Sequence, residues 1–310
     1  MTSTWGVPPI RLGERRVLHP GRWRWLRASA WLALLFFLTA GAFGLPVQWA
    51  VDHLPEGNTP LQLAGVVVAC AAALGCYALG VRLGEGRAPG ELALRPAVGG
   101  LVVGAGLGLL MMATLIGVLV VTGAYDVTPV GAAAPWAPLG LALQAAVTEE
   151  LWMRALLFRL LWRVVGPRWA LAAAAAVFAA LHLANPGANA LAGATVATAG
   201  LMFCALFAFT GRLLGPIGLH LALKLAQGYL FGAAVSGGAP GASLAVSTAG
   251  AGAPAWLTGG TFGPEASVVA LLIVALVTAV ALLRVPRNGP QSARLSNTSS
   301  VAVDRFMVMK

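Results

Sequence analysis

Charged residues and cysteines are both scarce in this sequence. Only 10% of the 310 residues are Asp, Glu, Lys or Arg, whereas 59% are hydrophobic. A soluble domain carries about 25% charged residues and about 45–50% apolar ones, so this composition excludes a large water-soluble enzyme. The three cysteines, Cys70, Cys76 and Cys204, lie inside apolar runs without a Cys-x-x-Cys pair. This pattern excludes a disulfide framework and a zinc site built from cysteines.

What the sequence has is a series of long apolar runs. A helix needs about 20 mainly apolar residues to cross a hydrocarbon core of about 30 Å. Eight runs meet this requirement, at residues 28–48, 61–81, 97–122, 138–162, 167–184, 190–210, 214–234 and 266–284. The predicted fold class is an all-α polytopic membrane protein, with about eight transmembrane helices in one bundle.

The spans are expected to form a single membrane domain, residues 28–284, in which 138–284 carries the chemistry. A basic segment, 1–27, precedes it, and a polar tail, 285–310, is expected to be disordered. Residues 235–265 are rich in Gly, Ala, Ser and Pro. Because this segment is longer than an ordinary connection, it predicts an external loop or a re-entrant piece.

Basic residues alternate from one side of the predicted spans to the other. The net charge is +10, yet every second loop lacks Lys and Arg, and the charged residues in these loops are Asp52, Glu56, Asp126 and Glu265. Such alternation predicts that both termini are cytoplasmic. The positive charge then reports orientation in the lipid bilayer, and no nucleic-acid partner is expected.

Glycines in the third span have a regular spacing. Gly100, Gly104 and Gly108 recur every four residues and therefore share one helix face. Inside a span, such a face predicts close packing against another helix rather than a nucleotide-binding loop.

A few ionisable residues lie inside the spans. Each costs at least about 2.5–3.5 kcal/mol at the membrane centre, so each is a candidate for function. They are Glu149, Glu150, Arg154, His182, His220 and Lys224, with Arg159 nearer the cytoplasmic end. Their concentration in a few spans is the main functional signal in the sequence.

The fourth span holds two adjacent glutamates with different surroundings. Glu150 and Arg154 are four residues apart, so they predict an ion pair on one helix face, either purely structural or supporting a site. Glu149 lies about 100° around the helix and has no cation one turn away. It needs a partner from another helix, or water, and a buried carboxylate of this kind suits a general base that activates water.

The histidines lie on two further spans. His182 ends the fifth span, and His220 is followed by Lys224 and Gln227 at helical spacing on the same face. Each histidine alone is more simply a hydrogen-bonded structural residue. Combined with the two glutamates, they provide the base, imidazoles and donors that hydrolysis in a membrane cavity requires. Counting about 1.5 Å per residue puts His182 nearer the external face, so it joins such a site only if its helix is tilted or displaced.

Three motifs occur in order on separate spans: Glu149-Glu150-x-x-x-Arg154, Phe178-x-x-x-His182, and His220 at the start of a third. In these motifs the sequence resembles bacterial members of the CPBP (Abi) family of intramembrane proteases. That family includes the type II CAAX prenyl endopeptidases and bacteriocin-immunity proteins. The stretches 227–237 and 258–265 are also similar to bacterial members, and the resemblance covers roughly residues 138–284.

The resemblance implies an endopeptidase of a bacterial inner (plasma) membrane that cleaves a membrane-associated protein or peptide. It also implies a polar cavity inside the helix bundle. In it Glu149 would be the base, and Glu150 with Arg154 its supporting pair. His182 would contact the water or a metal, and His220 would be a second metal ligand or a donor to the oxyanion. Zinc or another divalent metal at His182 and His220, and a metal-free glutamate mechanism, both stay open.

Lys224 departs from the family pattern, whose third motif usually reads His-x-x-x-Asn. A protonated lysine only donates hydrogen bonds. It repels a divalent cation near His220 but suits an anionic tetrahedral intermediate, which favours the metal-free mechanism. Alternatively, Lys224 neutralises Glu149 or Glu150 and the chain is an inactive scaffold or immunity protein. A proton-coupled transporter is a third interpretation.

Overall fold

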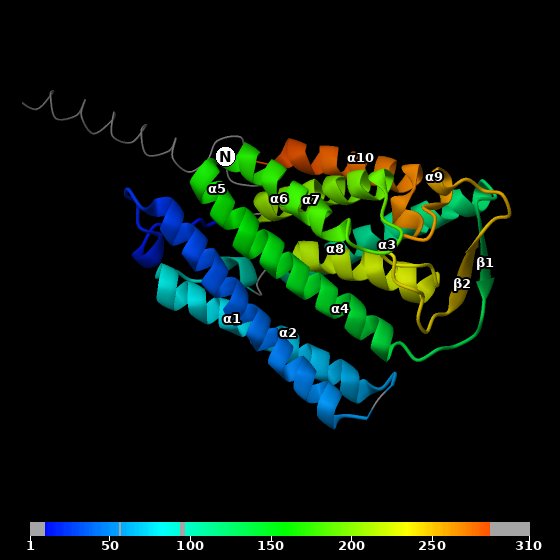
Figure 1. Ribbon diagram of the computed structural model, residues 1–310, viewed down its shortest axis with the longest axis horizontal. Helices are drawn as coiled ribbons and strands as arrows, with labels where there is room; N and C mark the ends of the chain where they lie inside the picture. The colour runs from blue at the N-terminus through cyan, green and yellow to red at the C-terminus, as the bar shows by residue number, and fades with distance from the viewer. Residues whose placement is uncertain (1–9, 56, 94–96, 286–310) are drawn as a thin grey trace, which may run out of the picture.

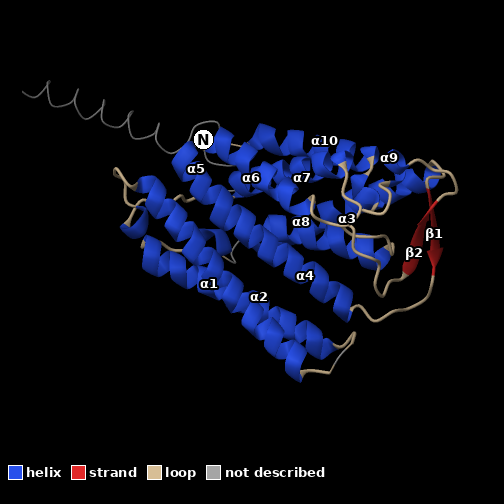
Figure 2. Cartoon of the chain, viewed as in Figure 1, coloured by secondary structure: helices blue, strands red, loops and turns tan. Residues whose placement is uncertain are grey.

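The computed structural model describes residues 10–55, 57–93 and 97–285. The predicted disordered tail therefore lies outside the described residues from 286 onward. Nearly all of the described chain is helical, as Figure 2 shows, with one pair of strands at one end of the bundle. This arrangement confirms the all-α class.

Each of the eight predicted spans contains a helix. Single helices are α1 (Arg24–His53), α2 (Pro60–Gly80), α3 (Ala97–Val121), α6 (Pro167–His182), α7 (Ala190–Thr210) and α10 (Val268–Arg284). Among the described residues, four stretches are long and apolar enough to cross a membrane, and α10 is a shorter apolar helix; the four are Arg24–His53, Pro60–Glu85, Val98–Val121 and Ala190–Thr210. The number of eight crossings stays a prediction.

Two of the predicted spans change from α-helix to π-helix part-way. The fourth runs through α4 (Trp136–Glu150), the π-helical η4 (Leu151–Phe158) and α5 (Arg159–Val165). The seventh runs through α8 (Leu214–Leu225) into the π-helical η5 (Ala226–Leu230), and a third π-helical turn, η2 (Val81–Glu85), extends α2. Since π-helical turns occur frequently at functional sites, the turn directly after Glu150 makes this part of the bundle a candidate functional site.

The continuous rod of α4, η4 and α5 crosses the centre of the bundle in Figure 1. The α1–α2 pair packs on one side of it, whereas α6, α7 and α10 lie on the other (Figure 1). Helix α3 packs along α8, and α7 packs against both α6 and α10. Asn189 caps α7 by accepting the Ala192 N–H, and Ser267 caps α10 by accepting the Ala270 N–H.

The glycine face of α3 packs against α8, as its spacing predicts. A methyl group at Gly104 would overlap the Gly215 carbonyl oxygen, and one at Gly108 would lie 2.5 Å from the Leu219 carbonyl oxygen. The two backbones therefore approach too closely for any side chain between them. This contact fixes α8, which carries His220 and Lys224.

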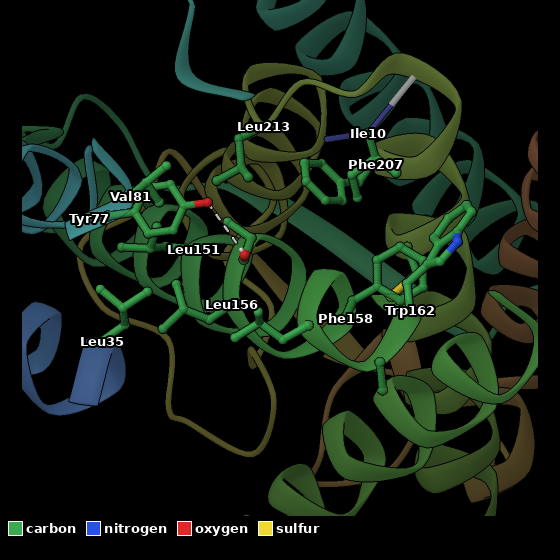
Figure 3. Close-up of a cluster of buried hydrophobic side chains, with 14 of the residues drawn as sticks. Ile10, Leu35, Tyr77, Val81, Leu151, Leu156, Phe158, Trp162, Phe207 and Leu213 are labelled. Atoms are coloured by element: carbon green, nitrogen blue, oxygen red, sulfur yellow. Dashed lines mark hydrogen bonds between the residues drawn. The ribbon is translucent and has the colours of Figure 1, made fainter. Parts of the chain in front are cut away.

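Large apolar side chains fill the space between α2, η4 and α7. Figure 3 shows the cluster, in which Leu151, Phe158 and Phe207 are fully buried. Tyr77 places its hydroxyl 3.5 Å from the Ala155 carbonyl oxygen (Figure 3). The aromatic and branched side chains surround the rod directly after Glu150 and fix its position.

A two-stranded ribbon was not expected from the sequence. Strand β1 (Tyr125–Pro129) pairs antiparallel with β2 (Ala245–Ala249), which belongs to the predicted loop or re-entrant segment. The same segment contains α9 (Ala255–Thr258) and leads to the 3₁₀ turn η6 (Pro264–Ala266). A strand of only five residues gives a weak pattern, and its partner is distant in sequence, so neither strand stands out beforehand.

A buried ionic network, defined here as the Glu85 network, joins η2, the 3₁₀ turn η3 (Gly90–Leu92) and α5. The Glu85 carboxylate accepts two hydrogen bonds from Arg159, at 2.7 and 2.9 Å, and one from Arg87 at 2.7 Å. Arg87 also donates to Glu91. Burial alone would raise the pKa of the Glu91 carboxyl, but the hydrogen bonds from Arg87 and Tyr77 and the charges of Arg159 and Arg87 together hold that pKa below its usual value.

The Glu85 network corrects one part of the sequence interpretation. The alternation of basic residues assigns Arg87, between the second and third spans, to a cytoplasmic loop, and Arg159 was placed near the cytoplasmic end of its span without a partner. Both guanidinium groups instead bind buried carboxylates, and Glu85 and Arg159 have no exposed surface. Sequence spacing does not reveal these pairs because Glu85 and Arg159 lie on different helices.

The glycine contact gives a stability test. We expect Gly108→Ala to lower the free energy of unfolding by about 1–3 kcal/mol, because its new methyl group overpacks the α3–α8 contact. Gly106→Ala is the matched control, since nothing lies within 4 Å of a methyl group there. Thermal unfolding of the purified protein in detergent measures both variants, and equal stability of the two would contradict the packing account.

Candidate active site

The two glutamates of the fourth span lie at the end of α4, where the rod becomes π-helical. The Glu150 carboxylate is completely buried and contacts the side chains of His220 and Arg154. Its Oε1 lies 2.8 Å from His220 Nδ1 on α8, and its Oε2 lies 3.1 Å from Arg154 Nε. The predicted ion pair with Arg154 is present, and Glu150 also connects α4 to α8.

The bond to Glu150 determines which His220 nitrogen is free. Because an ionised carboxylate only accepts hydrogen bonds, His220 Nδ1 carries the proton and donates it. The other nitrogen, Nε2, is then directed at Glu149, 3.8 Å from its Oε2. The Phe203 ring stacks on the imidazole at a centroid distance of 5.1 Å and limits its rotation.

Glu149 lies between two histidines that come from two other helices. Its Oε2 lies 3.8 Å from His182 Nε2 on α6 and equally far from His220 Nε2 on α8. A separation of 3.8 Å is too long for a direct hydrogen bond. This oxygen is buried and has no hydrogen-bond partner in the protein, although 26% of the side chain is exposed. An acceptor in this state is available to a small polar molecule.

The structure brings His182 close to Glu149, although residue counting puts His182 nearer the external face. Its Nδ1 lies 2.8 Å from the Phe178 carbonyl oxygen one turn earlier. Since a carbonyl oxygen can only accept, Nδ1 carries the proton and Nε2 is free to face Glu149. His182 therefore joins the other candidate residues rather than lying apart from them.

Arg154 is enclosed by aromatic rings. Its guanidinium carbon lies 4.6 Å from the centroid of Phe178 and 4.8 Å from that of Phe203. Cation–π contacts stabilise the buried charge from both faces. The two terminal nitrogens, Nη1 and Nη2, have no hydrogen-bond partner in the protein. The sequence pattern identifies Phe178 but gives no sign that Phe203, on α7, completes this enclosure.

A cavity of about 110 Å³ opens beside this cluster. Three predicted site residues line it, namely His182, His220 and Lys224. Side chains from α3, α7 and α10 form an apolar wall that includes Met111, Met112 and Met202. The arrangement provides polar groups on one side and flexible apolar side chains on the other, as in a site for a partly apolar ligand.

Lys224 reaches the cavity without forming a close ion pair. Within the described ranges, no carboxylate oxygen lies within 4 Å of its amino group. The alternative in which Lys224 directly neutralises Glu149 or Glu150 therefore has no support in the geometry. Its ammonium group remains available to the cavity.

Three further polar residues line the cavity, and the sequence analysis assigned no role to them. They are Gln227, Ser236 and Glu265. The sequence analysis noted Gln227 only for its spacing from His220. Glu265 belongs to residues 235–265, which were predicted to form an external loop or a re-entrant piece. The one sequence signal was that both stretches resemble bacterial CPBP members.

The predicted metal site has no matching side-chain arrangement. Across the parts of the chain that the structure describes, no group of three or more His, Cys, Asp or Glu side chains is placed to hold a metal ion. In addition, the Lys224 ammonium lines the same cavity as both histidines, and its charge repels a divalent cation. Metal binding by His182 and His220 stays a prediction that these residues fit poorly.

Comparison with known proteins bears on the region just described. Residues 131–226 match the family described as type II CAAX prenyl endopeptidase Rce1-like. This match contains all three motifs on which the resemblance rests. The match supports the resemblance to the CPBP (Abi) family over this region. No curated protein and no solved structure matches the chain.

This family match supports the fold of a CAAX-type intramembrane protease. The matched residues contain all of α4, the π-helical η4, α5, α6, α7 and α8, and they end at the first residue of η5. They therefore include every helix that supplies a predicted catalytic side chain. The apolar helices and this family together identify an integral membrane protein.

Breaking the buried ion pair gives a prediction for this site. We expect Arg154→Leu to lower the free energy of unfolding by about 3–5 kcal/mol, because it leaves the Glu150 charge buried without its cation. Arg168→Leu is the control, since this arginine is exposed at the start of α6. Thermal unfolding in detergent measures the difference, and an Arg154→Leu protein as stable as Arg168→Leu would contradict the role of the pair.

Proposed function

We propose that the chain is an intramembrane endopeptidase that hydrolyses a peptide bond through a water molecule activated by Glu149. The observation that carries this proposal is the free Glu149 Oε2, which faces the Nε2 atoms of His182 and His220 at 3.8 Å each. The family match supports a peptidase, and the catalytic roles below are our inference. The substrate is a protein or peptide associated with the membrane.

Water activation follows from the acceptors in the cluster. A water molecule hydrogen-bonded to Glu149 loses its proton to this carboxylate, and the resulting hydroxide attacks the carbonyl carbon of the substrate. The histidines hold the water in place, because their Nδ1 protons are already committed to Glu150 and to the Phe178 carbonyl. When the C–N bond breaks, the Glu149 carboxyl returns its proton to the leaving amine.

Charge on the tetrahedral intermediate needs donors in the cavity. Lys224 carries an ammonium group one helical turn after His220, and both side chains line the cavity. Such fixed donors stabilise an oxyanion much more strongly in a site with little water than in bulk solvent. Glu150 and Arg154 act indirectly, because they set the orientation of the His220 ring.

The surroundings of the cavity indicate the kind of substrate. Its apolar wall suits an aliphatic side chain or lipid group beside the scissile bond. The matching family is described as prenyl endopeptidases, so a peptide with a prenylated cysteine near its carboxyl terminus is the first probe. We place both termini in the cytoplasm, with the chain in a plasma membrane. No step of this mechanism uses a metal or a nucleic acid.

The test is cleavage of a quenched fluorescent peptide containing a prenylated cysteine, by protein purified in lipid nanodiscs. We expect Glu149→Gln to remain folded and inserted but to lose at least about 100-fold in kcat, because it removes the base. Asp126→Asn, an exposed carboxylate on β1, is the control and retains full activity.

The same assay distinguishes the alternatives. Wild-type cleavage that is unaffected by Glu149→Gln would refute the mechanism. Complete absence of cleavage would favour the noncatalytic scaffold or immunity protein. A chelation arm addresses the metal, because loss of activity after chelation, with recovery on adding zinc, would contradict the metal-free route.

A further inference from the structure

Ser236 lies in the wall of the cavity, in the loop between η5 and β2. It lines the cavity together with Glu265, which belongs to η6 directly before α10. The three sequence motifs include neither residue, and the proposed peptidase mechanism uses neither. The two side chains supply a hydroxyl and a carboxylate, the groups that a nucleophile and its base require.

Ser236 occupies the tip of a tight turn. Val235 and Gly238 exchange two backbone hydrogen bonds, at 3.1 and 2.9 Å, around Ser236 and Gly237. Both central residues have a positive φ, 50° at Ser236 and 82° at Gly237. Primed turns of this kind favour Asn, Asp or Gly at the first central position, so the serine is strained there. Strained turns are typical of functional sites and present the nucleophilic serine in some hydrolases.

Neighbouring loops hold this turn in place. The Gly237 N–H donates to the Phe262 carbonyl oxygen at 2.7 Å, and the Phe262 side chain is fully buried. A methyl group at Gly237 would lie 2.1 Å from the Pro186 carbonyl oxygen. The Ser236 hydroxyl is therefore carried by a backbone that is fixed on two sides.

The Glu265 carboxylate contacts two atoms of Ser236. Its Oε1 accepts the Ser236 N–H at 2.5 Å and lies 3.4 Å from the Ser236 hydroxyl oxygen. Its Oε2 accepts a bond from Gln227 Nε2, so Oε1 is the oxygen that faces the serine. A contact of 3.4 Å is long for two oxygens, as is common between a nucleophile and its base before a substrate binds.

Burial increases the basicity of this carboxylate. It raises the pKa of the Glu265 carboxyl above its usual value. A general base works best when its pKa lies near the working pH, so this shift suits a group that takes a proton from a hydroxyl.

The rest of the cavity suits an acyl group. Side chains from α3, α7 and α10 form its apolar wall, and its volume is about 110 Å³. A small apolar space of this kind accepts a short aliphatic chain. Lys224 lines the same cavity and provides positive charge for the oxyanion that forms when an ester carbonyl is attacked.

We propose that Ser236 and Glu265 form a second nucleophilic site, which takes the acyl group from esters of short aliphatic acids. The Ser236 oxygen bonds to the ester carbonyl carbon while its proton passes to Glu265 Oε1. The bond from that carbon to the alcohol oxygen then breaks, and the alcohol leaves with the proton. Water hydrolyses the acyl-serine by the same proton route, which releases the acid and restores the hydroxyl.

Labelling with an alkyl fluorophosphonate tests the nucleophile. The serine oxygen bonds to phosphorus, and fluoride leaves with the hydroxyl proton. We expect the protein in nanodiscs to carry this adduct on Ser236, located by mass spectrometry, and none on Ser29, an exposed serine of α1. Ser236→Gly should stay folded and unlabelled, because glycine adopts a positive φ freely and keeps the backbone N–H.

Replacing the base tests the pair. We expect Glu265→Gln to lower the labelling rate of Ser236 about 100-fold, because no carboxylate then takes the proton. Asp126→Asn, which removes an exposed carboxylate on β1, should react at the wild-type rate. Absence of an adduct on Ser236 in the wild-type protein, or an equal rate in Glu265→Gln, would overturn the proposal.

Hydrolysis of p-nitrophenyl butyrate measures the acyl transfer itself. We expect the wild-type protein to hydrolyse this ester and Ser236→Gly to lose at least about 100-fold in rate. Equal hydrolysis by both proteins would place the reaction elsewhere and contradict the proposal. The site does not rest on the proposed peptidase function. Ester hydrolysis without peptide cleavage would support this site and refute the peptidase, and the reverse result would do the opposite.

Discussion

The hydrogen bond between Glu150 and His220 is the interaction on which the candidate site depends. A carboxylate in an apolar bundle is strongly disfavoured unless cations and donors surround it. Glu150 meets this requirement with Arg154 on its own rod and with His220 on α8. The bond therefore links two helices and orients the imidazole. With His220 Nδ1 occupied, its Nε2 faces Glu149. The Oε2 atom of Glu149 lies equally far from His182 Nε2.

Two buried ionic clusters in the same bundle have different hydrogen-bonding states. In the Glu85 network every carboxylate oxygen accepts at least one hydrogen bond, as expected for a cluster that holds helices together. In the candidate site, Glu149 Oε2 and both terminal nitrogens of Arg154 lack a hydrogen-bond partner in the protein. Unsatisfied buried groups are costly, so they indicate function more strongly than burial of charge alone.

Much of the fold was predictable because membrane helices need long apolar runs, which the sequence displays directly. The glycine face of α3 and the Glu150–Arg154 pair were predictable from helical spacing. The π-helical turn after Glu150 was not, since it leaves no periodic pattern. Glu265 and the Glu85 network were missed because their partners lie on other elements. Charges near span ends appear topological in a sequence, and only packing shows which of them are buried.

Isotope labelling tests the central claim most directly. In a single turnover of the prenylated peptide in water enriched with oxygen-18, attack by an activated water places one labelled oxygen in the new carboxyl terminus. The account predicts this labelled product and an unlabelled Glu149 side chain, read by mass spectrometry. A label in the Glu149 carboxylate with an unlabelled product would show covalent attack by the glutamate and contradict the account.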